Sequence, residues 1–67
     1  MITVTLNGDP VDLPGSVETL EDFLLYYQTS LKEVAIEYNG NIVSASELSC
    51  RLEPQSTIEM IRFIGGG

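Results

Sequence analysis

The residues Thr57-Ile58-Glu59-Met60-Ile61-Arg62-Phe63-Ile64 are followed directly by Gly65-Gly66-Gly67. The first eight are rich in β-branched and apolar side chains, which predicts a last β-strand over residues 57–64. Three successive glycines predict a slim, flexible tail over residues 65–67, since glycine loses the most entropy on ordering and has no side chain to pack. Extended, this tail reaches roughly 10 Å. It could thread into the active site of another protein, although frayed termini are also common.

The start of the chain has the pattern of a β-hairpin. Residues 2–6 alternate apolar and polar side chains, which predicts a strand with one buried face. Asn7-Gly8 favours a tight turn because both residues tolerate positive φ. Residues 11–13 alternate again and predict a short return strand.

One amphipathic helix is predicted after the hairpin. Thr19 and Asp22 have the spacing of a capping box, in which each side chain accepts a hydrogen bond from the other residue's amide. We expect the helix to run from Leu20 to about Gln28. Its apolar side chains recur at helical spacing and form one continuous stripe: Leu20, Phe23, Leu24, Tyr27 and Leu31.

The second half of the chain again has a strand pattern. Residues 34–38 alternate, Asn39-Gly40 favours a turn, and Ile42-Val43 predicts a brief fourth strand. The stretch 44–52 is ambiguous, and Ser46-Glu47-Leu48 is a candidate for a short helical turn. The expected order is therefore β-β-α-β-β-β. This predicts an α+β domain over residues 1–64, with a mixed sheet of four to five strands and one main helix packed on one face.

Charge and cysteine content exclude several classes of function. The 67 residues carry ten acidic and three basic side chains, a net charge of −7, which argues against nucleic acid and against an anionic membrane surface. The acidic surface serves solubility, or it steers the chain toward a basic partner. No signal peptide or membrane span is expected. The lone Cys50 forbids an internal disulfide, so we expect a reducing, cytoplasmic location and a small buried thiol.

The element order and the glycine end together resemble the β-grasp fold of ubiquitin-like proteins, and more narrowly the ThiS family of sulfur carriers in thiamin biosynthesis. The resemblance covers almost the whole chain, and the glycine end is its most specific part. The loops differ from the family pattern at Ser44-Ala45 and at Glu53-Pro54-Gln55-Ser56. The matching segments are the opening strand with its Asn7-Gly8 turn, the helix after Thr19, the segment Val34–Gly40 with Ile42-Val43, and Ile58–Gly67.

This resemblance implies a protein carrier and not an enzyme. A ubiquitin-activating-type adenylyltransferase would use ATP and Mg²⁺ to adenylate the terminal carboxylate of Gly67. A sulfur-donating enzyme would then convert it to a thiocarboxylate, from which thiazole synthase takes the sulfur. Gly65 and Gly66 would give access, because any side chain would widen the thread. The alternatives are a carrier like the small subunit of molybdopterin synthase, and a ubiquitin-like modifier or binding module.

A second candidate site precedes the glycines. If Ile58 faces the helix, the period of two sends Ile61 and Phe63 to the other face of the sheet. There they would form a partner-binding patch together with Arg62 and Ile64, unless another element or a dimer partner covers them. Arg62 belongs to the inward register and is expected to extend outward near the strand end. We expect no bound cofactor and no metal site, because the sequence shows no ligand cluster and no phosphate-binding loop.

Overall fold

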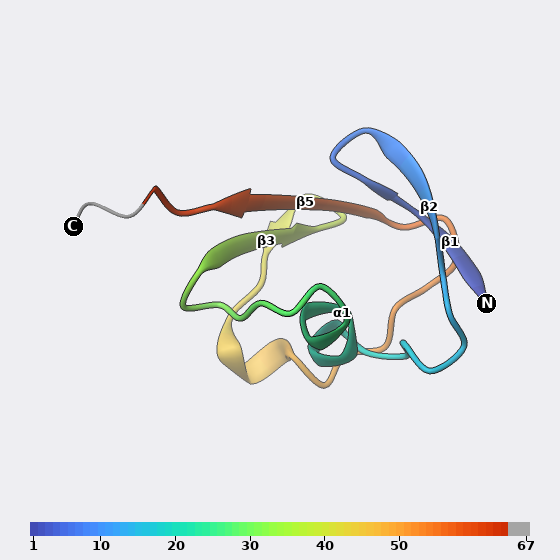
Figure 1. The fold of residues 1–67 in the computed structure, drawn as a ribbon, viewed down its shortest axis with the longest axis horizontal. Helices are drawn as coiled ribbons and strands as arrows, with labels where there is room; N and C mark the ends of the chain where they lie inside the picture. Colours follow the sequence, from blue (N-terminus) through green and yellow to red (C-terminus); the bar gives the residue numbers. More distant parts are fainter. Residues whose placement is uncertain (65–67) are drawn as a thin grey trace.

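The computed structural model describes residues 1–64, and Gly65, Gly66 and Gly67 lie outside the described residues. It confirms the order of elements and the α+β class. The helices and strands are β1 (Ile2–Leu6), β2 (Asp9–Leu13), α1 (Leu20–Tyr26), β3 (Val34–Tyr38), β4 (Asn41–Ile42), the 3₁₀ turn η1 (Ala45–Glu47) and β5 (Thr57–Arg62). Figure 1 shows α1 packed on one side of the sheet.

The five strands form one mixed sheet in the order β2-β1-β5-β3-β4. β5 runs parallel to β1 and antiparallel to β3. The last strand in sequence is therefore the central strand in space (Figure 1). The two antiparallel pairs β1–β2 and β3–β4 follow from tight turns: Asn7-Gly8 and Asn39-Gly40 both have positive φ, as the sequence predicts, and each folds a strand back beside its neighbour.

One hydrophobic core lies between the sheet and α1. Phe23 has no exposed surface and is the largest of the fully buried side chains. Burying an apolar side chain of this size contributes about 1.5–3 kcal/mol. The sheet supplies the other fully buried residues, on the alternate positions that face the helix: Val4, Leu13, Val34, Ile36 and Ile58.

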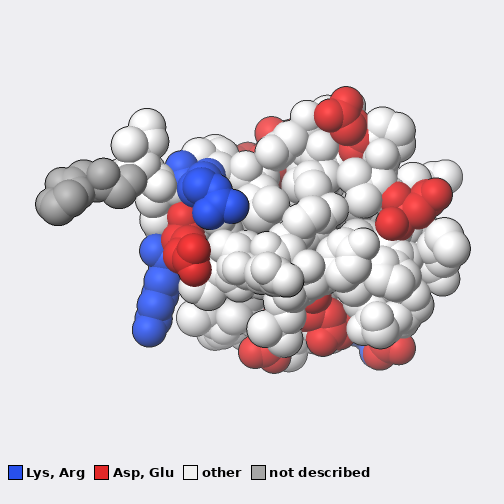
Figure 2. Space-filling model, viewed as in Figure 1, with Lys and Arg blue, Asp and Glu red and all other residues white. Residues whose placement is uncertain are grey.

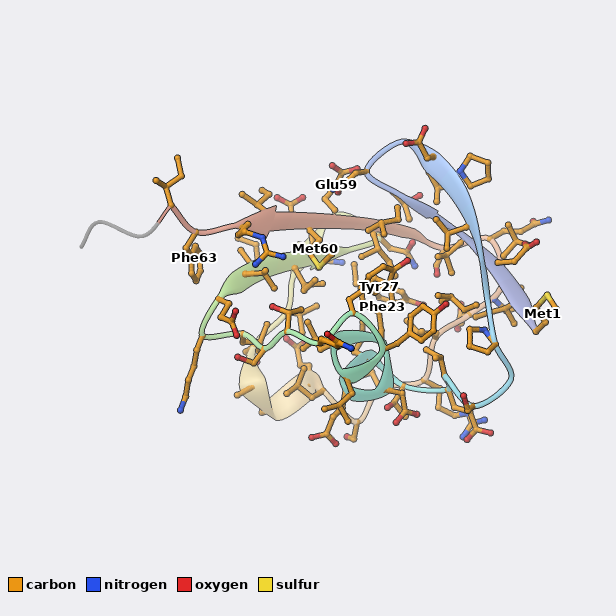
Figure 3. All side chains as sticks on the ribbon, in the orientation of Figure 1. Met1, Phe23, Tyr27, Glu59, Met60 and Phe63 are labelled. Atoms are coloured by element: carbon orange, nitrogen blue, oxygen red, sulfur yellow. The ribbon has the colours of Figure 1, made fainter. Side chains whose placement is uncertain are left out.

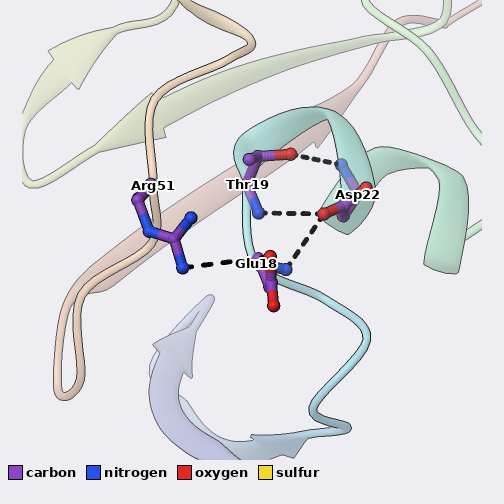
Figure 4. A network of polar contacts seen from close by, with 4 residues as sticks. All are labelled: Glu18, Thr19, Asp22 and Arg51. Carbon is purple, nitrogen blue, oxygen red and sulfur yellow. Dashed lines mark hydrogen bonds and ion pairs between the residues drawn. The ribbon is translucent and has the colours of Figure 1, made fainter.

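Helix α1 begins where the capping box predicts. Thr19 N donates to Asp22 Oδ2 at 3.2 Å, and Asp22 N donates to Thr19 Oγ1 at 3.1 Å (Figure 4). The N–H groups of the first turn are also occupied, because Leu20 N donates to Cys50 O and Glu21 N donates to Leu48 O. These bonds satisfy donors that have no partner within the helix. They also tie the segment between η1 and β5 to the start of α1.

The helix ends at Tyr26, two residues before the predicted end. Gln28 has φ of 57°, a left-handed conformation that stops the helix. Thr29 N donates to Leu24 O and Gln28 N donates to Leu25 O, which is the hydrogen-bond pattern of a Schellman motif. Leu31, which we placed on the helical stripe, follows the helix and still packs against the core.

Three strands differ from the prediction in their boundaries. β2 begins at Asp9 and not at Val11, because the two-residue turn sets Asp9 directly opposite Leu6. β4 covers Asn41–Ile42 and not Ile42-Val43, because the two-residue turn sets Asn41 opposite Tyr38, and Val43 then turns into the core. β5 ends at Arg62 and not at Ile64. Its partner β3 begins at Val34, which pairs with Arg62, so no strand remains for the residues beyond.

Candidate functional site

The predicted site has a described part and a part outside the described residues. Gly67, the expected reacting residue, and Gly65 and Gly66, expected to give access, belong to the second part. The described part is the end of β5 and the two residues after it. We call Ile61, Arg62, Phe63 and Ile64 the tail-base surface.

All four residues of the tail-base surface are exposed to solvent. Ile61 is 55% exposed, Phe63 53% and Ile64 96%. Large exposed apolar side chains gathered at one strand end are candidates for an interaction site. The sequence predicted their exposure; that a partner covers them stays a prediction.

Strict alternation along β5 predicted that Phe63 and Glu59 lie on the same face of the sheet. In the structure they do not. Figure 3 shows the Glu59 side chain and the Phe63 ring on opposite sides of β5. The physical reason is the end of the strand at Arg62, after which the backbone is no longer held in the sheet register. Within residues 1–64, the last backbone hydrogen bond between this end of β5 and the segment before β3 is donated by Phe63 N to Glu33 O, at 2.9 Å.

Two asparagine side chains brace β5, and sequence reasoning missed both. Asn7 Oδ1 accepts from Met60 N at 2.7 Å, and Asn7 Nδ2 donates to Met60 O at 3.1 Å. The amide therefore continues the parallel β1–β5 ladder after β1 has turned away. Asn39 Oδ1 accepts from Thr57 N at 2.9 Å, while Asn39 N donates to Thr57 O. The Asn-Gly turns were visible in the sequence, but their contacts with β5 were not.

The charge distribution is uneven, and its basic part lies at the end of β5. Figure 2 shows basic groups at one end of the molecule, with an acidic group between them. The register of the sheet brings two basic residues to the end of β5: Arg62 pairs with Val34, and Lys32 lies two residues before β3. Arg62 extends outward as predicted, and both side chains are exposed. Lys32 was not among the predicted site residues.

The carboxylates with shifted pKa values have capping roles. The Glu18 amide, which donates to Asp22 at 3.1 Å, is the main reason that the pKa of Asp22 lies below its usual value, and Thr19 adds to the effect (Figure 4). The Ser44 amide likewise lowers the pKa of Glu47. Both groups accept hydrogen bonds from backbone N–H donors at the start of a helix or turn. Within residues 1–64, no three His, Cys, Asp or Glu side chains form a group that could hold a metal ion.

Cys50 is exposed, which corrects the prediction of a buried thiol. Its backbone explains the difference: Cys50 N donates to Glu47 O, and Cys50 O accepts from Leu20 N at the start of α1. The residue is held as a cap for the helix, so its side chain lies at the surface. In the described part of the chain, no helix is long and apolar enough to cross a membrane.

A mixed five-stranded sheet with one helix on one face and the last strand at its centre defines the ubiquitin-like β-grasp class. Within that class, the ThiS family model matches residues 4–67, and the chain belongs to the ThiS family. The sulfur carrier protein ThiS of Bacillus subtilis (strain 168) is 33% identical over 63 residues, which cover 92% of this chain and 96% of that protein.

Solved structures agree on the fold. A crystal structure of the thiamine biosynthesis protein ThiS from Geobacter metallireducens has a TM-score of 0.76 and 22% identity, and it covers 98% of this chain and 100% of its own. A solution structure of a thiamine biosynthesis protein from the same organism has a TM-score of 0.79 and 23% identity, covering 98% and 88%. At this level of identity the similarity establishes the β-grasp architecture.

Proposed function

We propose that the chain is a sulfur carrier of thiamin biosynthesis. The observation that carries the proposal is membership of the ThiS family over residues 4–67, which includes the three glycines. A relative of nearly equal length is a sulfur carrier protein. The exposed tail-base surface at the end of the central strand supports the same reading, because a carrier must present its terminus to other proteins.

The proposed chemistry takes place on the α-carboxylate of Gly67. A carboxylate is a poor electrophile, so a ubiquitin-activating-type adenylyltransferase would bind ATP and Mg²⁺ and let one carboxylate oxygen attack the α-phosphorus. Pyrophosphate leaves and an acyl-adenylate forms. Hydrosulfide supplied by a sulfur-donating enzyme then attacks the acyl carbon, forms the C–S bond and displaces AMP. The resulting thiocarboxylate is the sulfur source for thiazole synthase.

The chain's own residues serve access and docking in this scheme. Gly65 and Gly66 would let the terminus pass through a narrow opening, since they add no side chain. Ile61, Phe63 and Ile64 would be covered by the partner's surface. The protein is then a carrier and co-substrate, not an enzyme. We place it in the cytoplasm, where a reducing environment keeps an exposed thiol such as Cys50 free.

The test is incubation with ATP, Mg²⁺, the activating enzyme of the same organism and a sulfur donor, followed by intact-mass and top-down mass spectrometry. Replacement of one oxygen by sulfur at Gly67 supports the proposal. An unmodified terminus, with the activating enzyme shown to be active on another carrier, would contradict it. Isopeptide conjugates between Gly67 and lysines would show a modifier in its place.

A further inference from the structure

We propose that Lys32 and Arg62, which we call the tail-base cation pair, dock onto carboxylates of the activating enzyme. These carboxylates would lie at the mouth of its active site. The inference rests on the proposed function, because it concerns the protein that receives the tail. It assigns a role in partner recognition to Lys32, which lies outside the tail-base surface. It also names carboxylates as the groups that Arg62 would bind.

The sheet brings the pair together although 30 positions separate the two residues in sequence. Arg62 lies opposite Val34 in the β3–β5 ladder, and Phe63 N donates to Glu33 O at 2.9 Å. Lys32 precedes this contact directly, so it lies at the same end of the sheet as Arg62. Figure 2 shows basic groups at this end of the molecule, with an acidic group between them.

Neither member of the pair has an acidic neighbour within salt-bridge distance among residues 1–64. The one ion pair in that part of the chain joins Arg51 to Glu18 at 3.8 Å, near the start of α1. Glu33 is an acidic neighbour in sequence, yet it lies within 4.0 Å of neither cation. Lys32, Glu33 and Arg62 together carry +1, which leaves −8 on the rest of the chain. The base of the tail is thus a small basic area on an acidic body.

This charge distribution specifies the charge of the partner's docking surface more closely than the net charge of the chain does. A uniformly basic docking surface would attract the body and repel the part that must approach most closely. A mouth with carboxylates attracts that part, and basic groups farther away still attract the body. Complementary charges of this kind set association rates and orientation. ATP phosphates are not the anions involved, because an extended tail places Gly67 roughly 17 Å beyond Arg62.

The experiment compares two variants with the same change of charge. Arg62→Glu and Arg51→Glu each change the net charge from −7 to −9, but only the first lies at the tail base. The measurement is ATP–pyrophosphate exchange by the activating enzyme, with the carrier varied at low and high salt. For Arg62→Glu we expect KM for the carrier to rise about tenfold at low salt, with kcat unchanged and the difference reduced at high salt. Lys32→Glu should behave similarly.

Arg51→Glu is the matched control, and its KM should stay within about twofold of the original value. Its ion pair with Glu18 is exposed, so losing it changes stability little. Arg62→Gln removes the charge without reversing it and should raise KM about threefold. Urea unfolding of each variant establishes that the fold is retained.

Equal KM values for Arg62→Glu and Arg51→Glu would overturn the inference, and so would tighter binding of Arg62→Glu. Either result would leave the proposed function standing, because exchange with the original chain would still occur. If the original chain supports no exchange, the proposed function fails and the inference fails with it.

Discussion

Replacing Asn7 with glycine tests whether its side chain holds the tail-bearing strand in place. Asn7 has φ of 50°, so glycine fits the turn without strain, and the side-chain amide is the only group lost from the folded contacts. The amide makes two hydrogen bonds to Met60, at 2.7 and 3.1 Å. At about 1 kcal/mol for each bond, their loss lowers the free energy of unfolding by about 2 kcal/mol. For a domain of this size that shifts Tm down by about 8–16 °C.

Asn39→Gly is the matched control for this prediction. Asn39 has the same φ of 50°, also precedes a glycine, and makes one side-chain hydrogen bond to β5, from Thr57 N at 2.9 Å. Both variants create a Gly-Gly turn, so their added unfolded-state entropy is the same. We therefore expect Asn7→Gly to be less stable than Asn39→Gly by about 1 kcal/mol, the worth of the second bond.

The assay is urea unfolding, with amide hydrogen exchange to locate the effect. In Asn7→Gly the Met60 N–H loses its hydrogen-bond acceptor and should exchange faster with solvent. The amides of β3 should still exchange only through unfolding of the whole domain. The reasoning is refuted if Asn7→Gly is at least as stable as Asn39→Gly and the Met60 amide exchanges at its original rate.

Four further perturbations test other parts of the structure. Phe63→Ser should raise KM for the activating enzyme with little change in Tm, because the ring is half exposed; a large fall in Tm would show that Phe63 stabilises the fold. Gly66→Val should unfold like the original chain in urea and lose adenylation; unchanged pyrophosphate exchange would contradict the threading argument. Phe23→Ala, at the fully buried centre of the core, should cost about 3–5 kcal/mol in urea unfolding. The Glu18 amide lowers the pKa of Asp22 in the folded state below 3.8, so ionised Asp22 stabilises the fold above that pH, and this contribution is lost as the pH falls through the folded-state pKa. Asp22→Asn should therefore flatten the acid side of the curve of unfolding free energy against pH. An unchanged curve would count against this role.

Features set by neighbouring residues could be predicted from sequence, and those set by distant ones could not. The capping box of Thr19 and Asp22 depends on residues three apart, and the Asn-Gly turns depend on two adjacent residues, so both were found. The end of β5 depends on where β3 begins. The contact between Asn7 and Met60 joins residues 53 positions apart. Such contacts become visible only when the sheet order is known.

The same distinction between neighbouring and distant residues applies to the candidate site. Exposure of Ile61 followed from the alternation of β5, since Ile58 had to face the core. The direction of Phe63 did not follow, because it lies beyond the last ladder pair. The position of Lys32 beside Arg62 also comes from β3–β5 pairing and has no signal in the local sequence. The exposure of Cys50 depends on bonds between its backbone, Glu47 and the start of α1.

The central position of β5 bears directly on the work that a carrier has to do. Ordering one residue for entry into an active site costs about 1–2 kcal/mol of backbone entropy. β5 is held by β1 on one side and β3 on the other, and the side chains of Asn39 and Asn7 add hydrogen bonds to Thr57 and Met60. Binding then does not have to order Met60 to Arg62, which the sheet already holds. On an edge strand, Met60 to Arg62 could fray, and ordering these three residues would add roughly 3–6 kcal/mol to the cost of binding. Under the proposed function, the fold thus lowers the conformational-entropy cost of threading before any contact with the partner forms.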